Sequence, residues 1–138
     1  MSFSDSEIAY LGSQPVGRLA TIRPDGTLQN SPVGFRYHPD LGTIDIGGHR
    51  MEHSHKFRNV AANGEVAFVV DDVPSTRPWR VRCLEIRGTA EAITAPEDSA
   101  YGVPAPIIRV RPRRIISYGI DQPDAEVHEL VPNSRNVA

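Results

Sequence analysis

Residues 47–56 (GGHRMEHSHK) bring glycine, basic and hydroxyl side chains together in one short segment. The two glycines allow the backbone to approach a bound group closely, and the side chains of Arg50 and Lys56 can neutralise an anion. Ser54 stands where a helix is expected to begin, and a helix N-terminus offers free amides and a partial positive charge. The segment therefore predicts a phosphate-binding site. The alternative is a plain turn followed by a solvated polar helix face.

Three histidines in the same segment also permit a metal-binding interpretation. His49 and His53 are four residues apart, and His53 and His55 are two apart. A zinc site needs ligands that converge on one face, together with a further ligand. The H-E-x-x-H pattern is absent from the sequence because Glu52 precedes the first histidine of its pair. The two glycines also make a continuous helix from His49 unfavourable, so we expect no metal ligands.

The remaining reactive side chains match no familiar catalytic pattern. The sequence contains no nucleophile elbow, no P-loop and no dinucleotide-binding glycine motif. Cys83 lies within an expected strand, where a cysteine is usually a small buried apolar residue. Trp79 is open to two interpretations, a core aromatic or a ring that stacks on a ligand. The arginine-rich run at 109–114 (RVRPRR) predicts the solvated face of two strands rather than a nucleic-acid contact.

Length and composition restrict the class of protein. The 138 residues predict a single domain spanning 1–138, and 39% apolar with 23% charged residues is ordinary for a globular chain. The net charge of −2 argues against a protein that binds nucleic acid or a membrane through its whole surface. The longest apolar run, residues 66–70, is far too short to span a bilayer. With one cysteine and no signal-peptide pattern, we expect a cytoplasmic protein.

Two short helices are expected. Ser4 and Glu7 have the spacing of a capping box, in which each side chain bonds the backbone of the other residue at the start of a helix. Apolar positions at helical spacing predict a second helix at 51–62, with Gly64 as the residue that terminates it. A further helical turn is expected at 96–98.

The rest of the chain favours strands. Seven segments combine β-branched and apolar residues with flanking turn residues. They lie at 16–23, 27–37, 43–46, 66–70, 79–86, 107–110 and 115–120. The first three predict a meander, a change of alternation near Cys83 predicts a β-bulge, and the last dozen residues are expected to fray. Many closely spaced strands with few helices predict an all-β barrel.

Four stretches of the chain, taken together, resemble a known family. They are residues 16–37 (VGRLATIRPDGTLQNSPVGFRY), 54–60 (SHKFRNV) leading into 66–72 (VAFVVDD), 78–93 (PWRVRCLEIRGTAEAI) and 107–120 (IIRVRPRRIISYGI). Their order and spacing are similar to those of the pyridoxamine 5'-phosphate oxidase-like split β-barrel proteins, which bind flavins or deazaflavins, and above all to the small actinobacterial type that uses coenzyme F420. The resemblance implies a mainly β fold, a split β-barrel of six to seven antiparallel strands in Greek-key-like order with two short helices.

The resemblance also implies where a cofactor would lie. Such proteins are homodimers with two equivalent sites at the subunit interface, each built from both chains. In the family the cofactor phosphate lies near the start of the middle helix, at the positions of Ser54 and Lys56, and residues at the positions of Trp79 and Arg82 come from the partner subunit. The strand at the positions of Asn30 to Val33 runs along the tricyclic ring of the cofactor. The implied cofactor contacts are Asn30, Ser31, Pro32, Val33, Gly48, His49, Arg50, Ser54, Lys56, Trp79 and Arg82.

Two departures from the oxidase's own pattern bear on the expected activity. The arginine that begins the oxidase's phosphate-binding strand has no match here, because the stretch reads Gln29-Asn30-Ser31. The Arg-Lys pair of the oxidase's helix reads His55-Lys56. These differences argue against oxidation of pyridoxamine phosphate and favour the F420-using relatives.

We therefore expect an F420-dependent oxidoreductase that transfers a hydride between the reduced deazaflavin and an unsaturated organic small molecule. The alternatives are an FMN-binding flavoprotein of the same family, or a non-catalytic carrier of FMN or F420. No catalytic residue is predicted, because hydride transfer is the chemistry of the cofactor while the protein positions and shields it. The choice of substrate is expected to depend on loops at 74–78 and 101–106.

Overall fold

The computed structural model describes residues 3–96 and 103–137 of the chain. Within them lie the helices α1 (Asp5–Ser13) and α2 (His55–Ala62) and the short 3-10 turns η1 (Met51–His53) and η2 (Val127–Glu129). The strands are β1 (Gly17–Ile22), β2 (Leu28–Val33), β3 (Arg36–His38), β4 (Thr43–Ile46), β5 (Glu65–Thr76), β6 (Trp79–Ala95), β7 (Ala105–Tyr118) and β8 (Asn133–Asn136). In the described part of the chain, neither helix has the length and apolar character needed to cross a membrane.

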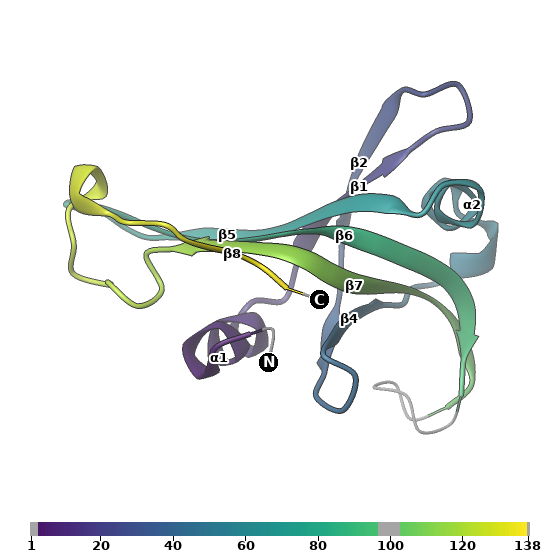
Figure 1. The fold of residues 1–138 in the computed structure, drawn as a ribbon, viewed down its shortest axis with the longest axis horizontal. Helices are drawn as coiled ribbons and strands as arrows, with labels where there is room; N and C mark the ends of the chain where they lie inside the picture. The colour runs from purple at the N-terminus through teal and green to yellow at the C-terminus, as the bar shows by residue number, and fades with distance from the viewer. Residues whose placement is uncertain (1–2, 97–102, 138) are drawn as a thin grey trace.

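The strands form one antiparallel sheet that is rolled into a barrel (Figure 1). Its order is β2-β1-β5-β6-β7-β4-β3, and β8 pairs with β7. The two ends of this order, β2 and β3, are separated in the chain only by Gly34 and Phe35. The chain covers at most ~11 Å over the three steps from Val33 to Arg36, so the ends of the sheet must lie close together. The expected mainly β barrel with two short helices is confirmed within residues 3–96 and 103–137, with eight strands there instead of six to seven.

Aliphatic side chains from the central strands fill the barrel. Leu19, Ile44 and Ile86 are each at most 1% exposed. The ring of Phe35 lies edge-on to that of Phe68, with 5.2 Å between the ring centroids. Phe35 lies at the break between β2 and β3, where the single strand expected at 27–37 is interrupted and the two halves pair with different strands. The first three strands therefore do not form the expected meander.

The predicted start of the first helix is confirmed. The amide of Glu7 donates to Ser4 Oγ over 3.2 Å, and the amide of Ser4 donates to Glu7 Oε1 over 2.9 Å. Both halves of the capping box are thus present at α1. The helix buries Tyr10 and Leu11 against the sheet.

The second helix begins later than predicted and ends at the predicted residue, Ala62. It begins at His55 rather than residue 51, because η1 precedes it and Ser54 caps it. Gly64 directly follows the C-cap Asn63, as predicted, but it does not adopt the left-handed conformation that is typical of a glycine at this position. The glycine is needed for a close approach instead, because a Cβ at Gly64 would lie 2.9 Å from the carbonyl oxygen of Ala90.

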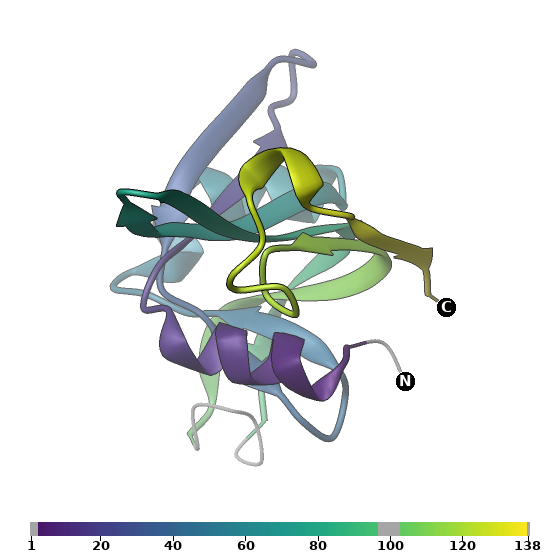
Figure 2. The ribbon, with the colours of Figure 1, turned by 90° about the vertical axis from the view of Figure 1, so that its left-hand side faces the viewer.

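The long hairpin formed by β5 and β6 runs along the long axis of the molecule (Figures 1 and 2). β5 continues to Thr76 through most of the expected loop at 74–78. Its pairing with β6 shifts register between Asp72 and Ser75, whereas pairing across Cys83 is regular. The bulge predicted near Cys83 is therefore wrong, and the irregularity lies on the partner strand.

The last two predicted strands are one. β7 runs unbroken past Pro112, which stands at a register shift opposite Gly88. A bulge tolerates a proline because one residue there is left out of the ladder. The expected helical turn at 96–98 and loop at 101–106 include residues outside the described part of the chain.

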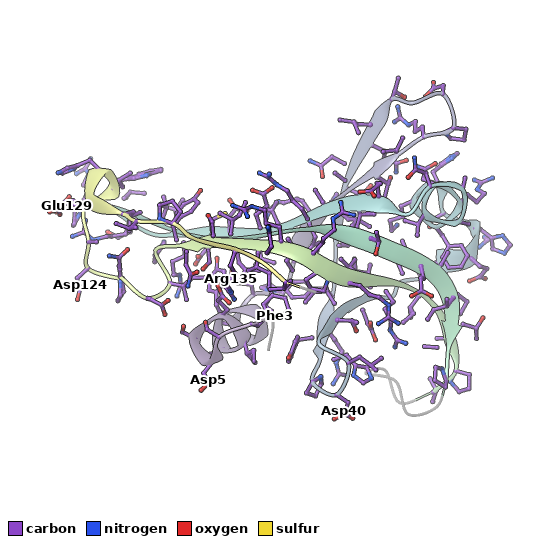
Figure 3. All side chains as sticks on the ribbon, viewed as in Figure 1. Phe3, Asp5, Asp40, Asp124, Glu129 and Arg135 are labelled. Carbon is purple, nitrogen blue, oxygen red and sulfur yellow. The ribbon has the colours of Figure 1, made fainter. Side chains whose placement is uncertain are left out.

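The C-terminal segment is paired rather than frayed, which corrects a further prediction. Arg135 of β8 lies beside α1 (Figure 3). Its Nη1 donates to Oε2 of the fully buried Glu7 over 3.1 Å, and Ser117 Oγ donates to the same oxygen over 2.6 Å. Burial alone would raise the pKa of Glu7, but the hydrogen bonds from Arg135, Ser117 and the Ser4 amide outweigh it and lower the pKa. The charged carboxylate therefore joins α1 to β8.

Candidate functional site

Residues 47–56 form a tight turn between β4 and α2. Arg50 has a left-handed backbone conformation, with φ 53° and ψ 41°, which is uncommon for a residue with a side chain. Met51 is 2% exposed and anchors the turn in the core. Ser54 Oγ donates to the carbonyl oxygen of Met51 over 2.7 Å and accepts from the amide of Phe57 over 3.2 Å. These contacts fix where α2 begins and place Lys56 in its first turn.

The start of α2 is electropositive. Its first turn carries no acidic side chain, and the first amides of a helix have no acceptor within the helix. Among residues 3–96 and 103–137, no carboxylate forms an ion pair with Lys56 or Arg50. The carboxylate of Glu52 lies 3.5 Å from Nε2 of His53. Free amides beside two cations without acidic partners are the chemistry that binds a phosphate, so these residues fit such a group.

The strand β2 offers an open backbone edge. Its described pairing is with β1 alone, so the groups along its other edge have no strand partner within the described residues. Pro32 fits this position because an edge strand does not need every N–H. The side chains of Asn30 and Pro32 are exposed, whereas Ser31 is half-buried and Val33 is buried. Val33 can therefore contact a ligand only through its backbone.

A shallow groove of about 260 Å³ runs over the outer face of β1, β5 and β6 and reaches Asn30. Small, half-buried apolar side chains form most of its floor, and charged side chains lie among its other lining residues. The lining comprises Arg18, Ala20, Asn30, Ala67, Phe68, Val69 and Glu85. This face of the barrel is less polar than a solvated sheet face usually is.

A buried amide joins α2 to the two strands beside it. Asn59 is 4% exposed, and its Nδ2 donates to Thr21 Oγ1 of β1 and to Gln29 Oε1 of β2, each over 3.1 Å. Helical spacing places Asn59 on α2, but it gives no signal for partners 38 and 30 residues away. Sequence reasoning missed this contact, which fixes the position of β2 relative to the helix that carries Lys56.

Trp79 and Arg82 lie apart from the other predicted site residues of the same chain. They belong to the tip of the β5–β6 hairpin, at the opposite end of the long axis from α2 (Figure 1). Figure 2 looks onto this end, with η2 facing the viewer and α2 behind. Trp79 is 50% exposed, so the core interpretation of this tryptophan is wrong.

Arg82 is held in place by its own chain. Its Nε and Nη2 donate to the two carboxylate oxygens of Asp72 over 2.9 and 2.6 Å, and its guanidinium lies 5.0 Å from the centre of the Tyr10 ring. The hydrogen bonds from Arg82 lower the pKa of Asp72 below its usual value. Burial and the hydrogen bond to Asp72 raise the pKa of Tyr10. The guanidinium therefore has a fixed orientation near the hairpin tip.

The arginine-rich run at 109–114 is only partly a solvated face. Arg109 is buried, and its Nη2 lies 2.8 Å from Oδ2 of the buried Asp45, contrary to the prediction. Arg111 and Arg113 are exposed; Arg111 pairs with Glu91 of the neighbouring β6, and Arg113 pairs with Glu65 of β5, beyond it. Among the described residues, no group of three or more His, Cys, Asp or Glu side chains is arranged to hold a metal ion.

The sequence pattern of the pyridoxamine 5'-phosphate oxidase family matches residues 5–132. A 5a,11a-dehydrotetracycline/5a,11a-dehydrooxytetracycline reductase from Streptomyces rimosus is 47% identical over 122 residues, which cover 88% of this chain and 86% of the reductase.

Two solved structures have a similar fold. An F420 reductase is 30% identical, with a TM-score of 0.55 over 75% of this chain and 90% of its own. An FAD-binding protein from Mycobacterium smegmatis is 21% identical, with a TM-score of 0.59 over 83% of this chain and 93% of its own. At that identity the second structure supports the fold alone.

Proposed function

The chain belongs to the pyridoxamine 5'-phosphate oxidase family and is an oxidoreductase, and from that premise we propose that it binds coenzyme F420 and reduces a tetracycline-type small molecule. The observation that carries the proposal is the electropositive start of α2, where Lys56 and Arg50 have no acidic partner among the described residues. Two relatives support it, since one is a reductase of dehydrotetracyclines and the other is an F420 reductase.

The residues of the site bind and orient the cofactor. When bound, reduced F420 supplies a hydride to one carbon of a C=C bond in the substrate, whose other carbon takes a proton from water, and the deazaflavin is thereby oxidised. Lys56, Arg50 and the first amides of α2 neutralise the cofactor phosphate. Ser54 keeps those amides in position, and the open edge of β2 at residues 30–33 runs along the ring.

We also propose a homodimer in which each cofactor site uses both subunits. The tip of the β5–β6 hairpin, which carries Trp79 and Arg82, lies at the far end of the molecule from α2, which carries Lys56 (Figure 1), so a single chain does not bring these residues to one cofactor. A partner subunit would supply them instead. The exposed ring of Trp79 is suited to stacking on a flat ligand, and the apolar floor of the groove at Asn30 is suited to contact with another chain.

The second candidate function is a carrier of FMN or F420 without turnover. It is favoured by the scarcity of carboxylates, because Glu52 is the only one within residues 28–33 and 47–56, where His49, His53 and His55 are the other side chains able to transfer a proton. An FMN-dependent flavoprotein is the related alternative, since a phosphate at Lys56 belongs to either cofactor.

Fluorescence titration of the purified protein with F420 and with FMN tests the cofactor. We expect F420 to bind with a micromolar or lower dissociation constant and FMN to bind more weakly, as the similarity to the F420 reductase suggests. Micromolar binding of FMN without detectable binding of F420 would instead make the protein a flavoprotein. The same titration with inorganic phosphate added as a competitor reports whether the cofactor uses an anion site.

A further inference from the structure

The amide of Asn59 begins a chain of hydrogen bonds that ends at Ser31, one of the predicted site residues. Asn59 Nδ2 donates to Thr21 Oγ1 and to Gln29 Oε1, each over 3.1 Å. Gln29 Nε2 then donates to Ser31 Oγ over 3.2 Å. The four side chains lie on one side of the β1–β2 hairpin, where Asn59 and Thr21 are buried and Gln29 and Ser31 are half-buried.

The direction of these hydrogen bonds decides whether the Ser31 hydroxyl can still donate its hydrogen or only accept. In this arrangement the Asn59 amide group donates both of its hydrogens, so the carbonyl oxygen of Gln29 faces Asn59 and its NH2 group faces Ser31. The Ser31 oxygen therefore accepts, and its own hydrogen remains to be donated. Within the described residues Ser31 makes no other side-chain hydrogen bond.

We propose that this chain of hydrogen bonds makes Ser31 a dedicated donor to an acceptor atom, a carbonyl oxygen or an imine-type nitrogen, on the ring of the bound cofactor. Asn59 and Gln29 are then positioning residues, and Ser31 selects a ring that presents an acceptor at that point. The inference rests on the proposed function, because it requires a cofactor ring along residues 30–33. Neither Asn59 nor Gln29 touches the cofactor, and both act through the orientation of one hydroxyl group.

The substitution Gln29→Glu reverses the direction of the hydrogen bond between residue 29 and the Ser31 hydroxyl, while it keeps the shape of the side chain at residue 29. A carboxylate only accepts, so it would take a hydrogen bond from Asn59 and another from Ser31. Ser31 would then have no hydrogen for the ring. We expect Gln29→Glu and Ser31→Ala each to weaken F420 binding about threefold to tenfold, which corresponds to one hydrogen bond.

The double variant separates this effect from the new negative charge. If the chain of hydrogen bonds acts through the hydroxyl, Gln29→Glu has little further effect on affinity in a Ser31→Ala background. If the carboxylate acts through its charge, the same loss appears with and without Ser31. The thermal midpoints of the apo variants show whether either change unfolds the protein.

The outcomes distinguish the inference from the function on which it rests. Wild-type protein that binds neither F420 nor FMN would overturn both. Wild-type protein that binds F420, with a Ser31→Ala variant of equal affinity, would overturn the donor role and leave the proposed function standing. An undiminished effect of Gln29→Glu in the Ser31→Ala background would also overturn the donor role.

Discussion

Replacing Lys56 with alanine is expected to weaken F420 binding by about ten- to a hundredfold and to leave the barrel folded. A charge-assisted hydrogen bond contributes about 1.5–3 kcal/mol, which corresponds to that loss in the dissociation constant. No carboxylate among the described residues pairs with Lys56, so the substitution does not leave a carboxylate without its cationic partner. The measurement is a fluorescence titration of apo wild type and variant at equal ionic strength.

Two further variants make the Lys56 result specific. Lys56→Arg should recover only part of the affinity, because a planar guanidinium replaces a compact charge. Arg111→Ala is the matched control, since it removes an exposed cation that pairs with Glu91 on the sheet. We expect it to change the affinity little. Unchanged affinity in Lys56→Ala would remove the phosphate role, and a collapsed thermal midpoint would make Lys56 a structural residue.

Mixed dimers are expected to regain a site that both parent variants lack. If each site combines Lys56 of one subunit with Trp79 of the other, then Lys56→Ala and Trp79→Ala homodimers are each defective in both sites. A dimer with one chain of each kind has one site with both changes and one site with neither. We expect such dimers, purified through two different tags, to bind about one F420 per dimer with wild-type affinity.

The same experiment has two outcomes that contradict the shared site. Trp79→Ala homodimers with wild-type affinity would remove the tryptophan from the site. Mixed dimers with no tight site at all would mean that each cofactor contacts one chain only. Light scattering of the wild-type protein gives the oligomeric state independently, and a monomer would overturn the proposal before any mixing.

Features that depend on neighbouring residues could be predicted from the sequence. The capping box of Ser4 and Glu7 and the cap at Ser54 involve residues three positions apart, so their spacing is visible in the chain. The strand β4 has the predicted bounds because turn residues flank it. The grouping of glycines and basic residues at 47–56 indicated the electropositive turn for the same reason.

Features that depend on distant residues could not be predicted. β8 is stabilised by pairing with β7 and by the contact between Arg135 and Glu7, which are 128 residues apart. Arg109 looked solvated because its partner Asp45 is 64 residues away. The hydrogen bond from Asn59 to Gln29 could not be predicted for the same reason, because the sequence around an asparagine in a helix does not indicate which residue of another element it bonds.

The measurement that tests the account most directly is the oxidation of reduced F420 by a 5a,11a-dehydrotetracycline, followed without oxygen through the absorbance of the oxidised deazaflavin. We predict that the wild-type protein catalyses this oxidation with one substrate reduced per F420 oxidised, and that Lys56→Ala needs far more cofactor to reach the same rate. If the protein binds reduced F420 tightly but catalyses its oxidation by none of the dehydrotetracyclines, enones or quinones offered, this would contradict the proposed reductase and make the protein a carrier.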